Sequence, residues 1–158
     1  MGEPGPRAGG GRWRPAPAAD LPDGLILFDG VCLLCSAWVR FVVRRDPAAR
    51  FRFVAIQDTA GRRMAARLGI SAAEPETNAV VLGGRAFFKS DAALTVLRHL
   101  PGWRWTAALR AVPRPLRDWA YDRIARNRYR LFGRTELCMV PTPELSARFL
   151  GGGRSGGA

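Results

Sequence analysis

Residues 25 to 45 restrict the fold more than any other stretch of this 158-residue chain. The stretch opens with a continuous apolar run at 25–28, which lies between Asp-Gly pairs at 23–24 and 29–30. A short apolar run bounded by turn residues is typical of a strand buried on both faces of a sheet. Between residues 35 and 45, apolar side chains surround arginines at helical spacing, which indicates a largely buried helix. A buried strand followed by a buried helix predicts an α/β fold.

The segments that follow continue this alternation and end in additional helices. We predict the following elements from three signals: alternating apolar residues, helix-capping residues, and a two-glycine turn between short apolar runs. They are a strand at 51–57, a helix at 59–68, a hairpin of strands at 79–82 and 85–88, a helix at 90–100, and C-terminal helices at 103–112 and 116–134. The order β-α-β-α-β-β-α is that of a thioredoxin-like three-layer core, with a C-terminal helical extension. The first two strands should be parallel, and the hairpin should add an antiparallel edge.

The length of the chain suits one domain with tails. Residues 1–24 are rich in proline and glycine, so we expect a disordered leader that forms neither helix nor strand. Residues 25–134 should form the thioredoxin-like domain, including the C-terminal helices. Residues 135–158 carry little pattern and end in glycine and serine, so we expect a weakly ordered tail.

The formal net charge of +12 is regional. Ten arginines lie between residues 98 and 134, against Asp118 and Asp122 only. Arginine-rich composition alone explains such a charge, and the arginine face of the last helix would then be solvated while Trp119, Tyr121 and Tyr129 pack in the core. The functional interpretation is attraction to acidic partners or an anionic membrane face. We expect peripheral membrane contact at most, and we do not expect nucleic acid as a partner.

Three cysteines without a secretory signal do not indicate a disulfide framework. No stretch has the roughly 18 consecutive apolar residues of a membrane span. We therefore expect a reducing, cytoplasmic location. In such a compartment, a closely spaced pair of cysteines is more often catalytic or metal-binding than structural.

Cys32 and Cys35 form a Cys-x-x-Cys pair at the mouth of the first helix. The backbone N–H groups of a first helical turn favour thiolate over thiol, and thiolate is the form that attacks disulfides. Cys32 should attack and Cys35 should resolve the mixed disulfide, without any bound cofactor. The rival hypothesis is a basic binding module whose pair is structural or holds zinc. Zinc would need two further ligands, and the spare candidates, Cys138 and His99, are isolated, so we predict no metal site.

Asp29 lies three residues before Cys32, and its side chain has two possible roles. It can accept hydrogen bonds from the backbone N–H groups that open the helix. Alternatively it can accept the proton of the resolving thiol, which would require a pKa raised by burial. A charged Asp29 would also raise the thiol pKa of Cys32, against the effect of the helix end. The sequence leaves the two roles open.

Several ordered segments resemble the DCC family of thiol-disulfide oxidoreductases, which is named for a shared Asp-x-x-Cys-x-x-Cys beginning. The matching segments are Phe28-Asp29-Gly30-Val31-Cys32-Leu33-Leu34-Cys35, Trp38-Val39-Arg40-Phe41, Arg50-Phe51-Arg52-Phe53, Ser90-Asp91-Ala92 and residues 121–130. The resemblance covers about residues 25 to 143. It implies a thioredoxin-like fold and disulfide exchange of the protein-disulfide reductase type. The substrate would be a disulfide-containing protein or a small thiol.

Three further residues are candidates for substrate binding. Thioredoxin relatives place a proline beside the dithiol at the start of the third strand, and in this chain that position falls at 77–79, so Thr77 is a candidate. Ser90 and Asp91 have the pattern of a helix cap. The same helix end could instead hold the carboxylate of a small thiol.

Overall fold

The computed structural model describes residues 15–71, 77–133 and 148–149. Its centre is a five-stranded sheet in the order β1-β5-β4-β2-β3. The strands are β1 (Ala16–Pro17), β2 (Leu25–Phe28), β3 (Arg52–Ala55), β4 (Ala79–Leu82) and β5 (Arg85–Phe88). As predicted, β2 and β3 are parallel, and β4 and β5 form an antiparallel hairpin. β2 is therefore a central strand, paired with β3 on one side and β4 on the other.

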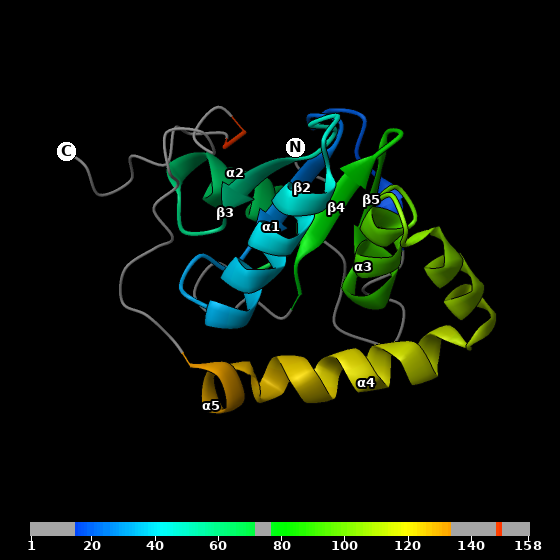
Figure 1. The fold of residues 1–158 in the computed structure, drawn as a ribbon. Helices are drawn as coiled ribbons and strands as arrows, with labels where there is room; N and C mark the ends of the chain where they lie inside the picture. Colours follow the sequence, from blue (N-terminus) through cyan, green and yellow to red (C-terminus); the bar gives the residue numbers. More distant parts are fainter. Residues whose placement is uncertain (1–14, 72–76, 134–147, 150–158) are drawn as a thin grey trace.

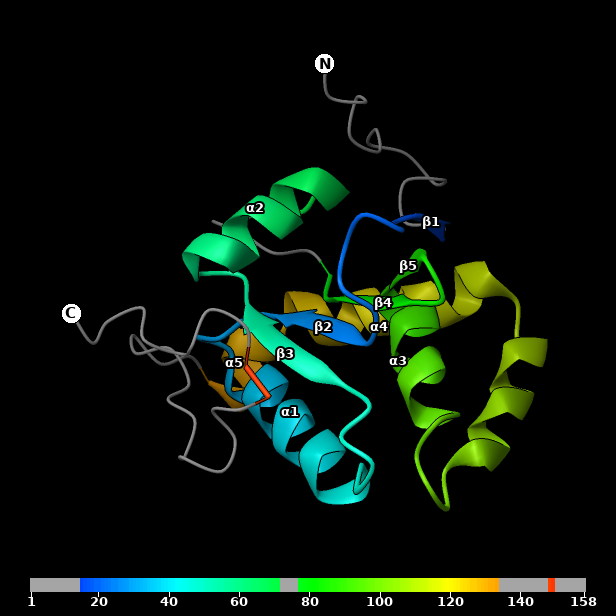
Figure 2. The same ribbon diagram turned by 90° about the horizontal axis from the view of Figure 1, so that it is seen from above.

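Alternate residues of the strands build two cores on opposite faces of the sheet. Leu25 and Leu27 of β2 face one core, where they pack with Leu68 of the helix that covers that face. Ile26 and Phe28 face the other core. Figure 2 shows α2 (Thr59–Leu68) on one side of the sheet, with α1 (Leu33–Arg45) and α3 (Lys89–Leu97) on the other. The predicted three-layer, thioredoxin-like α/β architecture is confirmed.

The helices of the core begin and end close to the predicted positions. α2 has the predicted bounds, and Gly69 ends it in the left-handed conformation with a φ of 78°. Gly61 lets α2 approach the sheet closely, because a Cβ atom at this position would lie 1.8 Å from the carbonyl oxygen of Ala55. α1 starts at Leu33, two residues earlier than predicted, so it includes part of the Cys-x-x-Cys segment. α3 starts at Lys89 and includes Ser90 and Asp91.

The C-terminal extension lies across one end of the three layers (Figure 1). It consists of a 3₁₀ helix, η1 (Arg104–Ala111), followed by α4 (Arg114–Arg126) and α5 (Arg128–Phe132). Ion pairs tie α4 to the start of α3. They are Arg114–Asp91, Arg117–Asp91 and Lys89–Asp122. α5 packs against α1, so the extension covers the end of the sheet from which the cysteine segment emerges.

Two predictions about the ends of the chain need correction. Ala16–Pro17 forms β1, which pairs with β5, so the predicted leader does contain a strand and the hairpin is not the edge of the sheet. Phe149 forms a parallel bridge with Phe53 of β3, although we predicted a weakly ordered tail there. Arg148 supports this bridge through an ion pair with buried Asp46. The other residues of the leader before residue 15 and of the tail lie outside the described residues.

No helix in the described ranges is long and apolar enough to cross a membrane. The arginines of α4 and α5 alternate with large exposed apolar side chains rather than buried ones. Trp119, which we predicted to pack in the core, is 60% exposed, and Leu116, Ile124 and Leu131 are exposed as well. The expected membrane contact of this surface stays a prediction.

Candidate active site

The two cysteines meet at the start of α1. Cys32 is the N-cap residue of the helix, and its sulfur accepts a hydrogen bond from the backbone N–H of Cys35 at 3.4 Å. A helix N-terminus carries partial positive charge, because its first N–H groups lack intrahelical acceptors. The predicted interaction between the helix opening and Cys32 is therefore present. Both cysteines are free thiols.

This geometry separates the acidities of the two thiols. The pKa of Cys32 is lowered to about 6, mainly because the Cys35 side chain donates a hydrogen bond to its sulfur, with a further contribution from the Cys35 backbone N–H. The pKa of Cys35 is raised, because its proton is held in that hydrogen bond and because its side chain is largely buried. At neutral pH the pair therefore holds one thiolate, on Cys32, and one thiol, on Cys35.

The more acidic thiol, Cys32, is the less exposed of the two. Cys32 is 0% exposed, whereas Cys35 is partly exposed and lines a cavity. α5 contributes to the cover, because Gly133 at its end accepts a hydrogen bond from the backbone N–H of Leu33. The stabilised thiolate therefore lies beneath the protein surface, and the thiol faces the cavity.

Asp29 is buried behind the cysteines and is held by four donors. One carboxylate oxygen accepts hydrogen bonds from Gln57 Nε2 at 2.7 Å and from the backbone N–H of Val31 at 3.2 Å. The other oxygen accepts from the Tyr129 hydroxyl and pairs with Arg128 Nη2 at 3.3 Å. Gln57 also accepts from the backbone N–H of Gly30, which fixes the turn before the cysteines.

The N-cap role predicted for Asp29 is wrong. Cys32 occupies the N-cap position of α1, and Asp29 bonds to Val31, two residues before the helix starts. Asp29 joins the cysteine turn to α5 instead, through Arg128 and Tyr129. The charges of Asp29 and Arg128 act on the thiols in opposite senses, because Asp29 raises the pKa of both cysteines and Arg128 lowers it.

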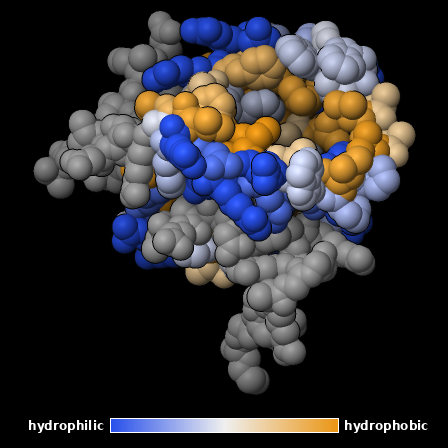
Figure 3. All heavy atoms as spheres, turned by 90° about the horizontal axis from the view of Figure 1, so that it is seen from below, coloured by the Kyte–Doolittle hydropathy of each residue, from blue (hydrophilic) through white to orange (hydrophobic). Residues whose placement is uncertain are grey.

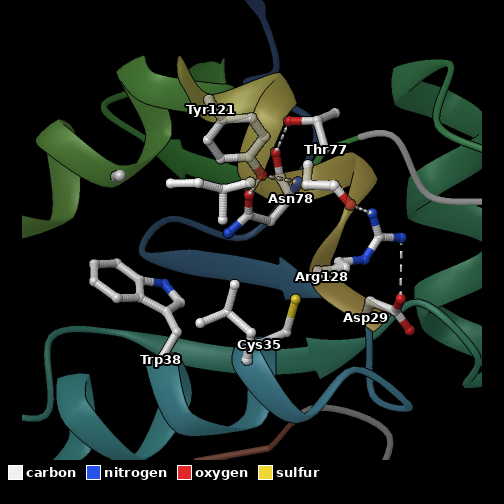
Figure 4. A pocket seen from close by; sticks show the side chains of 11 residues that line it. Asp29, Cys35, Trp38, Thr77, Asn78, Tyr121 and Arg128 are labelled. Carbon is white, nitrogen blue, oxygen red and sulfur yellow. Dashed lines mark hydrogen bonds and ion pairs between the residues drawn. The ribbon is translucent and has the colours of Figure 1, made fainter. Parts of the chain in front are cut away.

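A cavity of about 310 Å³ lies next to Cys35, between α1, α3 and α4. Figure 4 shows the Cys35 sulfur pointing into this space, with Trp38 on one side and Arg128 and Asp29 on the other. Apolar side chains form most of the remaining wall, namely Leu34, Ala93, Ile124 and Ala125. On the face crossed by α4, hydrophobic residues gather around a hollow, with hydrophilic residues beside them (Figure 3).

The wall opposite Cys35 is formed by Thr77, Asn78 and Tyr121 (Figure 4). The backbone N–H of Asn78 donates to the Tyr121 hydroxyl at 3.2 Å, and its carbonyl oxygen accepts from Thr77 Oγ1 at 2.7 Å. The Tyr121 hydroxyl in turn donates to the Asn78 side chain. Burial raises the pKa of Tyr121 to about 12, so it is a neutral hydrogen-bonding group. Thr77, predicted to bind substrate, therefore does line the cavity.

Ser90 and Asp91 lie away from this cavity. The predicted capping role is wrong, because Phe88 is the N-cap residue of α3 and Ser90 and Asp91 lie inside the first turn of the helix. Asp91 is buried and pairs with Arg114 and Arg117, while Ser90 donates to Asp118 Oδ1 at 2.5 Å. Both residues thus hold α4 in place, and their predicted contact with substrate stays a prediction.

The described residues contain no group of three or more His, Cys, Asp or Glu side chains close enough to hold a metal ion. His99 follows α3, where its Nδ1 atom lies 2.8 Å from the carbonyl oxygen of Thr95. Cys138 lies outside the residues that the structure describes.

Four of the residues around the dithiol were not predicted as site residues: Gln57, Trp38, Tyr121 and Arg128. A signal existed for Trp38, Tyr121 and Arg128, because the segments 38–41 and 121–130 are among those that resemble the DCC family. The arginines of segment 121–130 were interpreted as a solvated face and its tyrosines as core. Gln57 follows β3, and the parallel pairing of β2 with β3 brings it beside Asp29.

Comparison with known proteins identifies the family. The family model described as DCC1-like thiol-disulfide oxidoreductase matches residues 26–134, more than half of the chain. A Bacillus subtilis (strain 168) protein, named as uncharacterized protein YuxK, is 39% identical over 131 residues, which cover 82% of this chain and 96% of the relative. The Arabidopsis thaliana DCC family protein At1g52590, chloroplastic, is 35% identical over 116 residues, covering 72% of this chain and 67% of that protein.

No solved structure matches the chain significantly. The matched region begins within β2 and continues past the end of α5, so it contains the cysteine pair, Asp29 and both of the α5 residues that bind Asp29. With the thioredoxin-like α/β core and the free cysteine pair at the start of α1, these matches place the chain in the DCC1-like thiol-disulfide oxidoreductase family.

Proposed function

We propose that this protein is a thiol-disulfide oxidoreductase of the disulfide-reductase type, in which Cys32 attacks and Cys35 resolves. The observation that carries the proposal is the position of the two free thiols at the N-terminus of α1, where the Cys32 sulfur accepts a hydrogen bond from the backbone N–H of Cys35. A pKa of about 6 makes Cys32 a thiolate at neutral pH. A thiolate with a neighbouring thiol is the chemical requirement for two-step disulfide exchange.

The proposed reaction moves two electrons from the dithiol to a disulfide R–S–S–R. The Cys32 thiolate attacks one sulfur of the substrate, which forms a Cys32–S–S–R mixed disulfide and expels RS⁻. The Cys35 thiol gives its proton to the expelled RS⁻. The resulting Cys35 thiolate attacks the Cys32 sulfur, closes the Cys32–Cys35 disulfide and releases the second RS⁻. No cofactor enters these steps, because the two sulfurs carry both electrons.

In this proposal Asp29 is a positioning residue. Its oxygens accept hydrogen bonds from Gln57 and Val31 on one side and from Tyr129 and Arg128 on the other. Asp29 thus fixes the turn before Cys32 and holds Arg128 near the thiols.

We place the activity in a reducing compartment of the cytoplasmic type. Two free thiols three residues apart stay reduced there and are available for exchange. The partner of the reduced form is then a disulfide, either in a protein or in a small molecule.

Replacing Cys35 by Ser is expected to trap the first intermediate of the proposed reaction. The variant keeps the attacking sulfur but lacks the resolving one, so incubation with a disulfide should leave a stable mixed disulfide on Cys32. Mass spectrometry of the intact protein, followed by peptide mapping, measures the adduct and its position. Wild type should accumulate the internal disulfide instead.

Cys32→Ser is the matched control for this experiment. It keeps the partly exposed sulfur and removes the stabilised thiolate, so it should form adducts much more slowly. An adduct on Cys35 in this variant, together with no adduct on Cys32 in Cys35→Ser, would reverse the assigned order of attack. No adduct in either variant would remove the proposed exchange altogether.

A further inference from the structure

We propose that the cavity beside Cys35 binds the apolar part of a small organic disulfide, which makes such a molecule, rather than a protein disulfide, the substrate. This inference rests on the proposed exchange reaction and names its substrate class. It starts from the size of the cavity. A volume of about 310 Å³ lies at the lower end of the range of roughly 300–1,000 Å³ that is usual for small-molecule sites.

The chemistry of the cavity wall favours an apolar group with a hydrogen-bond acceptor. Leu34, Ala93 and Ala125 present only hydrocarbon. The indole N–H of Trp38 is buried and has no hydrogen-bond acceptor within the described ranges. A buried donor without an acceptor costs free energy. A ligand with a carbonyl or carboxylate oxygen that accepts a hydrogen bond from this N–H would therefore bind more tightly. The Trp38 ring itself stacks on Phe41, which fixes the indole in the wall.

The position of the cavity connects it to the reacting atoms. The sulfur of Cys35 points into it (Figure 4), and the backbone N–H of Cys35 donates a hydrogen bond to the Cys32 sulfur at 3.4 Å. A disulfide bound through its apolar part therefore lies beside the sulfur pair. Cys32 itself is 0% exposed and is not among the residues that line the cavity, so a ligand in the cavity approaches the sulfur pair from the side of Cys35.

The backbone around the cavity argues against an extended peptide as the ligand. Peptides that add to a sheet edge need free backbone N–H and C=O groups to pair with. At Asn78, which faces the dithiol, the N–H donates to Tyr121 and the carbonyl oxygen accepts from Thr77. Tyr121 belongs to α4, so the C-terminal extension occupies the N–H of Asn78, while Thr77 occupies its carbonyl oxygen.

Two matched disulfides test the substrate class. The symmetrical disulfides of N-acetylcysteine amide and N-acetylcysteine benzylamide have the same atoms around the S–S bond, and the second adds a phenyl ring on each half. The reduced protein is mixed with each disulfide, and the loss of protein thiols gives a second-order rate constant. Each rate constant is divided by that of dithiothreitol with the same disulfide. We expect a benzylamide-to-amide ratio of about ten or more, from burial of the ring.

Filling the cavity should remove this preference. Ala93→Leu places a larger side chain in the cavity wall, and the ratio should fall to about one. Ala37→Leu makes the same change on the exposed face of α1, away from the cavity wall, and should keep the wild-type ratio. If Ala93→Leu does not fold, as judged by thermal unfolding, Ala125→Leu fills the cavity from α4.

The possible results separate this inference from the proposed function. A wild-type ratio near one, or insulin disulfides reduced faster than the benzylamide disulfide, would overturn the small apolar substrate while leaving the exchange reaction intact. An unchanged ratio in the folded cavity-filling variant would show that the preference arises elsewhere and would also overturn the inference. If no disulfide oxidises the protein thiols, the proposed function fails and the inference fails with it.

Discussion

Titration of the reduced protein is expected to show one thiol ionising near pH 6, while the second stays protonated far above neutral pH. The first is Cys32, whose pKa is lowered to about 6 by the hydrogen bonds from the Cys35 side chain and backbone N–H. The second is Cys35, whose pKa is raised by the hydrogen bond to Cys32 and by burial. The ultraviolet absorbance of thiolate measures both without requiring a reagent to reach the buried sulfur.

The rate of exchange should follow the same ionisation. Below pH 6 the thiolate fraction of Cys32 falls about tenfold for each pH unit, and the rate should fall with it. Above about pH 7 the fraction is nearly complete, and the rate should reach a plateau. The Cys32→Ser variant should lose the transition near pH 6. Cys35→Ala should shift the Cys32 transition upward, because it removes the side-chain donor that contributes most to lowering this pKa. A wild-type midpoint near the ordinary cysteine value of roughly 8.5 would contradict this picture.

Removing the charges of Asp29 and Arg128 is expected to move the Cys32 pKa in opposite directions. Asp29→Asn removes a negative charge that raises this pKa, so the midpoint should fall below the wild-type value of about 6. Arg128→Met removes the positive charge that lowers it, so the midpoint should rise above the wild-type value. The same ultraviolet titration measures both shifts.

Arg126→Met is the matched control, because it removes the same charge two residues earlier, at an exposed position at the end of α4. It should leave the midpoint within a few tenths of the wild-type value. An unchanged midpoint in both Asp29→Asn and Arg128→Met would show that these charges are not coupled to the thiol. A midpoint raised by Asp29→Asn would show instead that the loss of hydrogen bonds to Gln57 and Arg128 outweighs the loss of charge.

The core of the fold could be predicted because its signals are local. The buried run at 25–28, the two-glycine turn at 83–84 and the Gly69 stop are each set by a few neighbouring residues. The start of α3 was predicted one residue late, at Ser90 instead of Lys89, because the capping pattern of Ser90 and Asp91 is also a local signal. Serine and aspartate are good capping residues, but here the side chain of Ser90 bonds to Asp118 and that of Asp91 pairs with Arg114 and Arg117. These partners lie on α4, 23 to 28 residues away.

The active site was only partly predictable, because its long-range contacts leave no local pattern. The sequence indicates Cys32, Cys35 and Asp29, since they share one motif. Arg128 lies 99 residues from Asp29 along the chain, and only the packing of α5 against α1 brings them together. The helical spacing of residues 121–130 fits core, solvent or site equally well. The cavity likewise depends on where α4 crosses the layers, which no single segment encodes.

A redox titration of the wild-type protein tests the central claim most directly. The protein is equilibrated in buffers of increasing potential, and the free thiols are counted by mass after alkylation under denaturing conditions. The proposed dithiol predicts one reversible two-electron transition between a Cys32–Cys35 dithiol and disulfide, at a potential in the range of roughly −270 to −120 mV that related dithiols span. The absence of a reversible transition, or stoichiometric zinc that keeps both sulfurs reduced, would contradict the claim.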